Sequence, residues 1–261
     1  MYETLKRNRA AVEHVILALV LPFVAGAINA SGFFAVGSYT SHVTGNVARI
    51  GDELAQGHLR LALRCCGFAG AFVAGAMVAT GMVLWARGRG EARYFRVLLL
   101  EAVLLAVFAS LNLSADRPRY FLNDFVLTSL LCFAMGLQNA MVTKLSGARI
   151  RTTHLTGVTT DIGIESVRLL HRIGQRVPGT SWSSTFRALW HDHDFVHLRL
   201  HLSIWISFLL GACVGPLSYI RVGHFALLIP CAILVLLAVY DLVLGLTEAR
   251  APQLATPVAS S

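Results

Sequence analysis

The stretch AGAINA at residues 25–30 returns as MGLQNA at residues 135–140, and TSHVTG at residues 40–45 returns as TTHLTG at residues 152–157. Both pairs are separated by a little over a hundred residues and keep the same order along the chain. Such ordered matches predict an internal duplication, in which the second half of the chain repeats the fold of the first.

Composition predicts that this duplicated unit lies in a membrane. The 261 residues are 56% hydrophobic and only 14% charged, with a mean hydropathy of +0.64. A soluble domain carries nearer a quarter charged residues, and a disordered chain is far less apolar. These values therefore exclude a water-soluble globule and a disordered chain. The five cysteines lie in apolar runs without CxxC spacing, so we expect small core residues rather than disulfides or zinc ligands.

Six apolar runs are long enough to cross about 30 Å of hydrocarbon as helices, which takes roughly 20 residues each. They cover approximately residues 14–36, 61–85, 95–113, 122–142, 200–220 and 225–246. The predicted organisation is an N-terminal tail at 1–13, a first three-span repeat at 14–113 and a second at 122–246. A cytoplasmic loop at about 171–199 interrupts the second repeat, and a flexible C-terminal tail covers 247–261.

The distribution of positive charge predicts the orientation. With the N-terminus inside, sixteen of the 22 Lys and Arg residues fall in cytoplasmic segments and six fall outside. Cytoplasmic loops of membrane proteins are enriched in these residues, so both termini are expected in the cytoplasm of a bacterial cell, with the chain in its inner membrane. The net charge of +8 has the same explanation and does not indicate a nucleic-acid partner.

Because each half holds three spans, an odd number, the second copy must enter the membrane from the opposite side. We therefore predict an all-α, polytopic membrane protein of six transmembrane helices, arranged as 3+3 inverted-topology repeats. Transporters use this construction because it offers two similar half-sites that face opposite compartments.

A third matched pair, FVAGAMV from Phe72 and FLLGACV from Phe208, falls in the second and fifth spans. Small residues recur there every fourth position, which lets two helix backbones approach closely. We expect these two helices to cross each other near the symmetry axis; the alternative is a face that packs against any neighbouring helix or forms a homodimer. The two small-residue stripes are Gly67, Ala71, Gly75 and Ala79 in one span and Ser203, Ser207, Gly211 and Gly215 in the other.

Spans one and four are predicted to be interrupted. Gly26, Asn29, Ser31 and Gly32 cluster in the first, and residues 136–139 bring Gly, Gln and Asn together in the second. Buried amides must be hydrogen-bonded. We expect Asn29, Gln138 and Asn139 to cap broken helices or line a cavity, or else to form hydrogen bonds between helices.

Each His-Thr-Gly motif is predicted to open a short amphipathic helix, which is re-entrant in one interpretation. Ser or Thr just before the helix supplies an N-cap, and the helix N-terminus suits an anion or a polar ligand oxygen. His42 and His154 add groups that titrate near neutral pH, and hydroxyls and an amide accompany them. The alternative for each histidine is a satisfied interior side chain. The candidate substrate-binding residues are Asn29, His42, Thr44, Asn46, Gln138, Asn139, His154, Thr156 and Asp161.

Arg49 and Asp161 occupy related positions after the two motifs and carry opposite charges. We hypothesise that they pair across the axis as a gate. Glu165 and Arg168 follow Asp161 on one helix face, and a solvated face is the alternative for both. Glu101 in span three and Asp241 in span six are intramembrane carboxylates near the cytoplasmic boundary, where snorkelling or pairing with Arg is the simpler explanation for Glu101.

The cytoplasmic loop carries a weak candidate metal site at His191, His193, His197 and His201. The last three share a helix face, and His and Asp clusters bind zinc or nickel. A histidine-rich surface turn is the favoured alternative. No nucleophile elbow, P-loop, dinucleotide fingerprint or kinase signature occurs, so we expect no enzyme activity and no cofactor.

These motifs resemble those of the YoaK-like family of uncharacterised bacterial inner-membrane proteins. The matching elements are residues 25–33, 41–46, 134–140 and 151–157, followed by Thr160 and Asp161. The resemblance covers roughly residues 14–245 and implies a multi-span protein labelled as a small-molecule permease. It transfers no substrate and no active site.

The predicted function is passive or proton-coupled passage of a small polar solute through a mid-membrane site between the repeats. The expected partners are the lipid bilayer and that solute. The alternative is a non-transporting membrane scaffold or sensor that acts through its His-rich cytoplasmic loop.

Overall fold

The computed structural model describes residues 16–87, 94–112, 121–145, 155–175, 181, 190 and 192–254, and these ranges contain helices and no strand. The elements in chain order are η1 (Ile16–Val20), α2 (Leu21–Val36), α3 (Val43–Ala55), α4 (Leu59–Arg87), α5 (Phe95–Asn112), α6 (Phe121–Leu145), α7 (Leu155–Gly174), α9 (His193–Val222), η2 (Gly223–Leu227) and α10 (Leu228–Leu254).

A helix occupies each of the six apolar runs predicted from the sequence, so the all-α prediction is confirmed for the described ranges. Four helical runs are long and apolar enough to cross a membrane: Ala18–Val36, Leu59–Ala86, Asp124–Lys144 and His193–Gly245. The last run contains both α9 and α10, and therefore two of the predicted spans. Helix α10 continues to Leu254, beyond residue 246, where the sixth predicted span ends.

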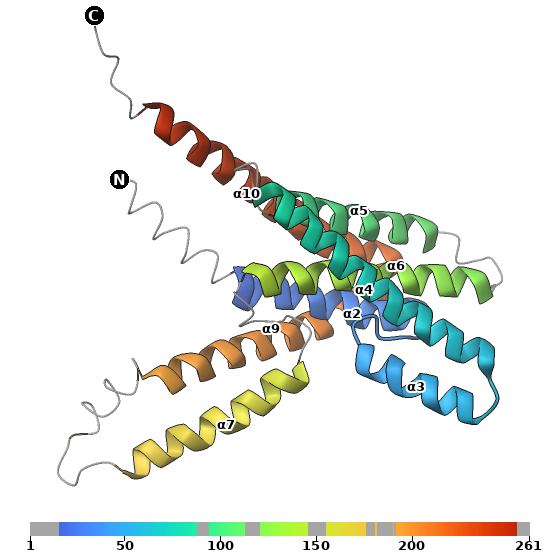
Figure 1. Ribbon diagram of the computed structural model, residues 1–261, viewed down its shortest axis with the longest axis horizontal. Coiled ribbons are helices and arrows are strands. Elements are labelled where there is room, and N and C mark those ends of the chain that lie inside the picture. Colours follow the sequence, from blue (N-terminus) through green and yellow to red (C-terminus); the bar gives the residue numbers. More distant parts are fainter. Residues whose placement is uncertain are drawn as a thin grey trace, which may run out of the picture.

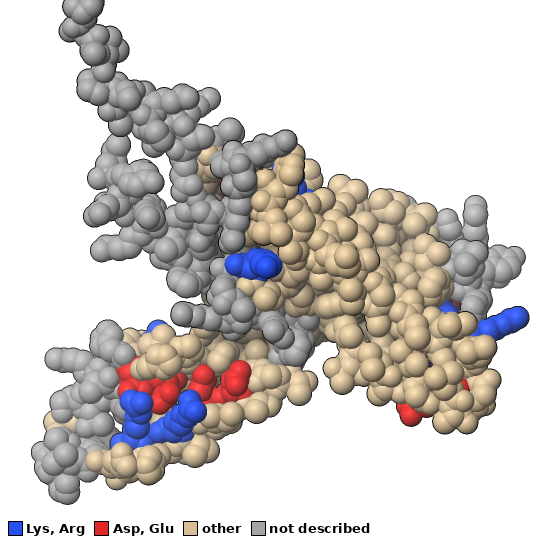
Figure 2. Space-filling view, in the orientation of Figure 1, with Lys and Arg blue, Asp and Glu red and all other residues tan. Residues whose placement is uncertain are grey.

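The surface of these helices is largely apolar. Large side chains such as Met77 on α4, Leu210 on α9 and Leu236 on α10 are more than half exposed. Figure 2 shows that charged side chains gather at the end formed by α7 and the start of α9, while the body between the two ends is mostly uncharged. Apolar surface of this extent is suited to lipid rather than water.

Two close helix crossings form the centre of the molecule. At the crossing of α2 with α9, a Cβ on Gly26 would collide with the carbonyl oxygen of Phe208, and one on Gly211 with that of Phe23. Glycine is needed at both positions because the two backbones touch directly.

The crossing of α4 with α6 repeats this arrangement with the equivalent residues. A Cβ on Gly136 would collide with the carbonyl oxygen of Phe72, and one on Gly75 with that of Phe133. The residues matched between the halves by sequence, Gly26 with Gly136 and Gly75 with Gly211, therefore make matched contacts.

Two sequence predictions about these segments are wrong. The small-residue stripes of α4 and α9 do not pack on each other: each packs on the first helix of the other half, where Phe133 and Phe23 present their carbonyl oxygens. Helices α2 and α6 are also uninterrupted through the Gly and Asn residues that were expected to break them. The glycines there allow close backbone approach and do not end the helix.

The helix directions follow from these contacts. Leu19 of η1 and then Phe23 and Ala27 of α2 contact Ser207, Gly211 and Gly215 of α9 in the same order, so α2 and α9 run parallel. Helices α4 and α6 are parallel as well, because Gly67 lies against Phe125, and Gly75 and Phe72 meet Phe133 and Gly136 further along.

Helices α5 and α10 pack antiparallel and bridge the rest of the structure (Figure 1). Asp241 of α10 accepts hydrogen bonds from the backbone N–H groups of Tyr94 (2.8 Å) and Phe95 (2.9 Å), and so satisfies donors at the start of α5. At the other end Cys231 Sγ donates to the carbonyl oxygen of Ala102 at 3.4 Å. The intramembrane carboxylate of Asp241 is therefore a helix cap.

The packing divides the remaining helices into two bundles, each with members from both halves of the chain. The first bundle is α2, α7 and α9, and the second bundle is α3, α4 and α6. Figure 1 shows α3 and α7 extending outward in different directions from the body. The two bundles meet where Gln138 Nε2 of α6 donates to the carbonyl oxygen of Leu21 of α2 at 3.1 Å.

Candidate functional site

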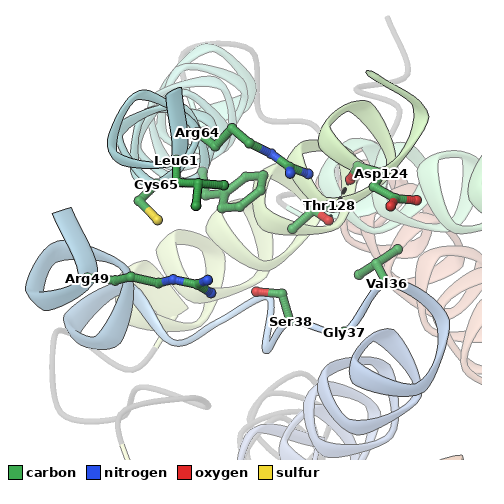
Figure 3. Close-up of a pocket in the computed structure, with 10 residues that line it drawn as sticks. Val36, Gly37, Ser38, Arg49, Leu61, Arg64, Cys65, Asp124 and Thr128 are labelled. Carbon is green, nitrogen blue, oxygen red and sulfur yellow. Dashed lines mark hydrogen bonds between the residues drawn. The ribbon is translucent and has the colours of Figure 1, made fainter. Parts of the chain in front are cut away.

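A polar pocket lies in the second bundle, where the end of α2 meets α3, α4 and α6 (Figure 3). Its volume is about 180 Å³. Apolar walls come from Val36, Leu61 and Phe68, and the polar lining consists of Ser38, Arg49, Arg64, Cys65, Asp124 and Thr128. Pockets that bury drug-sized ligands usually exceed about 300 Å³, so this one suits a smaller solute.

The turn that leads into the pocket is held by Asn29. Gly37 adopts a left-handed conformation (φ 70°) and ends α2, with its N–H donating to Phe33. The chain then folds back so that the Ser41 N–H donates to Asn29 Oδ1 at 3.0 Å, and the Thr40 hydroxyl lies 3.4 Å from the same oxygen. Asn29 thus fixes the loop between α2 and α3 and is not a cap for a broken helix.

Arg49 reaches the pocket from α3 and is held by Glu53 one turn later. Arg49 Nε donates to Glu53 Oε1 at 3.0 Å, and His58 Nδ1 lies 3.0 Å from Glu53 Oε2. These two partners, with Arg49 the stronger, hold the pKa of Glu53 below its usual range. Arg49 is therefore positioned by its own helix.

Arg64 enters from the first turns of α4 and extends across the pocket toward Asp124 and Thr128 of α6 (Figure 3). The Thr128 hydroxyl donates to the backbone carbonyl of Asp124 at 2.7 Å, and both residues line the pocket. Two guanidinium groups and one carboxylate thus surround a small volume, and they can bind a polar solute through charge-assisted hydrogen bonds.

The first His-Thr-Gly motif opens α3 as predicted, but not through a hydroxyl cap. His42 is itself the N-cap residue and makes no side-chain capping bond. Its imidazole packs over Gly45, where a Cβ would overlap the ring. His42 and Thr44 are exposed, while Asn46 is buried on the inner face of α3. The motif therefore shapes the first helical turn.

The second motif opens α7, which begins at Leu155; His154 lies outside the described residues. Thr156 and Asp161 are both exposed. Among the ion pairs of the described chain, none joins Asp161 to Arg49, which is bonded to Glu53 instead. The pairing across the axis therefore does not occur in this conformation.

Glu165 on α7 is buried, unlike the solvated face considered from the sequence. Its Oε2 lies 2.9 Å from His201 Nδ1 of α9, and both side chains are only about a tenth exposed. Arg172 adds ion pairs to Asp192 and, at 3.0 Å, to Asp194. These contacts hold α7 against α9, as Glu53 and its partners secure α3.

The sequence matches a known protein family over most of its length. The profile of the family described as "Protein of unknown function (DUF1275)" matches residues 17–240. The chain belongs to this family.

Two curated relatives extend over most of the chain. It is 28% identical over 226 residues to the UPF0700 transmembrane protein RA0705 of Rhizobium meliloti (strain 1021), covering 87% of this chain and 84% of that protein. It is 27% identical over 231 residues to the UPF0700 transmembrane protein YoaK of Bacillus subtilis (strain 168), covering 86% and 92%. No solved structure matches. The resemblance to the YoaK-like family is confirmed, and the chain is a membrane protein of the UPF0700 transmembrane family.

In this family member, the amides at the end of α6 form hydrogen bonds between and within helices. Gln138 links α6 to α2, and Asn139 Nδ2 donates to the carbonyl oxygen of Met135 at 3.1 Å. Both side chains are buried. Of the interpretations open from the sequence, bonding between helices therefore holds for Gln138.

The histidines of the predicted metal site do share one face of α9. The rings of His193 and His197 are 4.2 Å apart, and those of His197 and His201 are 6.2 Å apart. Over the described residues, no three His, Cys, Asp or Glu side chains are arranged to hold a metal ion. His191 lies outside those residues, and His201 is bonded to Glu165.

Sequence reasoning singled out Arg49 but missed Arg64, Asp124 and Thr128 as members of the same pocket. Their meeting depends on the parallel packing of α4 with α6, which the sequence did not predict. The available signal was the pair of charges near the starts of two apolar runs, Arg64 in one and Asp124 in the other.

Proposed function

We propose that this protein is a permease of the bacterial inner membrane, which moves a small polar solute between two inverted three-span repeats. Both termini lie in the cytoplasm in this proposal. The observation that carries it is the matched pair of glycine crossings, α2 with α9 and α4 with α6, made by residues that correspond between the halves.

The helix directions support six alternating spans. In such a topology spans one and five point the same way, spans two and four point the other way, and spans three and six are antiparallel. The three packed helix pairs follow this scheme: α2 is parallel to α9, α4 is parallel to α6, and α5 is antiparallel to α10. Two copies that enter from opposite sides would also carry α3 and α7 to opposite faces of the membrane.

The packing of a helix from one half of the chain on a helix from the other half suggests how such a permease would move. Each crossing joins one helix from each half through direct backbone contact, so the first and second bundles are the rigid units, and not the two halves of the sequence. Movement of one bundle against the other would open the solute site alternately to each side. Gln138 at the bundle contact and the pocket beside α2 lie where the bundles meet.

The pocket chemistry supports a small polar solute. Arg49, Arg64 and Asp124 offer both charges within a volume of about 180 Å³, and the lining includes the Ser38 and Thr128 hydroxyls. A solute held there would gain charge-assisted hydrogen bonds, which are roughly twice as strong as neutral ones.

Uptake by proteoliposomes over a panel of small polar solutes tests the proposal. Wild-type protein should move at least one solute faster than empty liposomes do. Arg64→Gln should slow that uptake by about tenfold or more, since a hydrogen bond to a charged group contributes about 1.5–3 kcal/mol. Arg60→Gln is the matched control, because Arg60 is exposed on the same turns of α4 and lies outside the pocket.

Two results would contradict the permease. One is a panel on which no solute moves faster than through protein-free liposomes, which would favour the scaffold or sensor. The other is an equal loss in Arg60→Gln and Arg64→Gln, which would remove the pocket from the pathway. His42→Ala and His154→Ala, assayed together, test whether the two motifs contribute as a pair.

A further inference from the structure

One carboxyl group of the described chain is completely buried and has no partner. Glu101 of α5 is 0% exposed, and neither of its carboxylate oxygens has a hydrogen-bond partner. Its neighbours one turn before and after on the same helix face, Val97 and Leu105, are also 0% exposed. Snorkelling and pairing with Arg96, considered from the sequence, do not describe this side chain, because Arg96 lies over the ring of Trp85.

The helices packed on α5 bring no ionic partner to this carboxyl. Helix α10 contributes Cys231, which bonds to the Ala102 carbonyl, and Asp241, which caps the start of α5; η2 contributes His224 and α6 contributes Cys132. Helices α4 and α6 carry their charged side chains near their ends. None of these groups is bonded to Glu101.

An ionised carboxylate is very unfavourable in such a place, because burial removes its hydration and no cation or donor replaces it. A protonated carboxyl is a neutral polar group, and its burial is far less costly. Ionisable residues inside membrane-spanning segments are rare, and they commonly mark ion pathways and proton relays.

Glu101 also lies in the pair that bridges the two bundles. Helix α5 packs on α10, and it also contacts α6 of the second bundle and η2. A rearrangement of the bundles would therefore change the surroundings of α5, and water that reached Glu101 could accept its proton. The carboxyl would lose H⁺ to water and become a carboxylate, with no other bond made or broken.

We propose that Glu101 is the proton-binding site of this protein: it carries a proton in the conformation described here and releases it when the bundles move, which couples solute passage to a proton gradient. The coupling rests on the proposed permease function. The protonation of Glu101 in this conformation does not.

Infrared spectroscopy of the reconstituted protein near neutral pH tests the protonation directly. Wild type should show the carbonyl stretch of a protonated carboxyl group, and Glu101→Gln should lose it. Glu165→Gln is the matched control, because Glu165 is also buried but is paired with His201. If Glu101→Gln does not fold, Glu101→Asp should shift the band. A wild type without the band, or a band that persists unchanged in the folded Glu101 variant, would overturn the proposal.

Solute accumulation under an imposed pH gradient tests the coupling. One proton per solute supports about tenfold accumulation per pH unit, since a tenfold ratio corresponds to about 1.4 kcal/mol. Wild type should reach a ratio of this order, and Glu101→Gln should equilibrate the solute without accumulation. Full gradient-driven accumulation by Glu101→Gln would overturn the coupling. Absence of any uptake by wild type would refute the permease, while the infrared result would still decide the proton on Glu101.

Discussion

Replacing Gly211 by alanine should force α9 away from α2. The added Cβ would lie 2.0 Å from the carbonyl oxygen of Phe23, and real Cβ atoms essentially never approach another heavy atom closer than 3.0 Å. The obstacle is backbone, so no side chain can move aside. Helix α2 must then retreat by about 1 Å, which weakens contacts along the whole crossing. Overpacking of this kind costs about 1–3 kcal/mol.

The matched control is Gly70→Ala on α4, where a Cβ would meet nothing within 4 Å. Alanine favours a helix over glycine by about 1 kcal/mol, and this gain is common to both variants. The difference in unfolding free energy between Gly211→Ala and Gly70→Ala should therefore be about 1–3 kcal/mol. Unfolding in mixed micelles, followed by far-UV circular dichroism, measures it.

The equivalent residue in the other half makes the prediction sharper. Gly75→Ala, on the same helix as the control, should lose as much stability as Gly211→Ala, because Gly75 meets the Phe133 carbonyl in the same way. If Gly211→Ala and Gly75→Ala were as stable as Gly70→Ala, the two backbone crossings would be wrong.

Three further predictions concern the polar contacts. Asn29→Leu removes the acceptor for Ser41 and should destabilise the loop before α3 by about 1–3 kcal/mol, seen as faster amide hydrogen exchange at residues 38–45. Glu165→Leu removes the hydrogen-bond partner of His201 and should destabilise the packing of α7 on α9 by about 1–3 kcal/mol; Arg168→Gln, whose guanidinium is exposed and 3.9 Å from Asp194, should change it by less than about 1 kcal/mol, and limited proteolysis after α7 compares the two variants. Because the pKa of Glu53 is lowered, the stabilisation that Glu53 gives to α3 should persist above pH 4.5, the pKa of a free glutamate, and be lost as the pH falls further. Hydrogen exchange in α3 as a function of pH measures this stabilisation. The Glu53→Gln variant should not show the pH dependence.

Much of the fold follows from local patterns. Apolar runs of about 20 residues predict helices wherever they occur, and the TSHVTG and TTHLTG motifs correctly predict the starts of α3 and α7. The matched glycines also identify residues that are structurally equivalent. In contrast, the breaks predicted in α2 and α6 are wrong, because a Gly within a helix serves close packing as readily as a break.

The site is harder to predict because it depends on which helices meet. The stripe of small residues on α4 could pack against any smooth helix face. It packs against α6 rather than α9 because of long-range contacts around Phe133. Arg64 and Asp124 are far apart in sequence and come together only through that choice. Likewise, the full burial of Glu101 depends on α10 and α6 covering α5, which the hydropathy of α5 alone does not reveal.

The central claim is that the two halves enter the membrane from opposite sides, and the accessibility of Thr44 and Thr156 tests it most directly. Both are exposed at corresponding positions in the first turns of α3 and α7. Each would be replaced by Cys in a chain without its five native cysteines, and intact cells would be treated with a membrane-impermeant thiol reagent. The account predicts that the reagent labels Thr44→Cys in intact cells. It predicts labelling of Thr156→Cys only after the cells are broken and the reagent reaches the cytoplasmic face of the membrane. Labelling of both from the same side would contradict it.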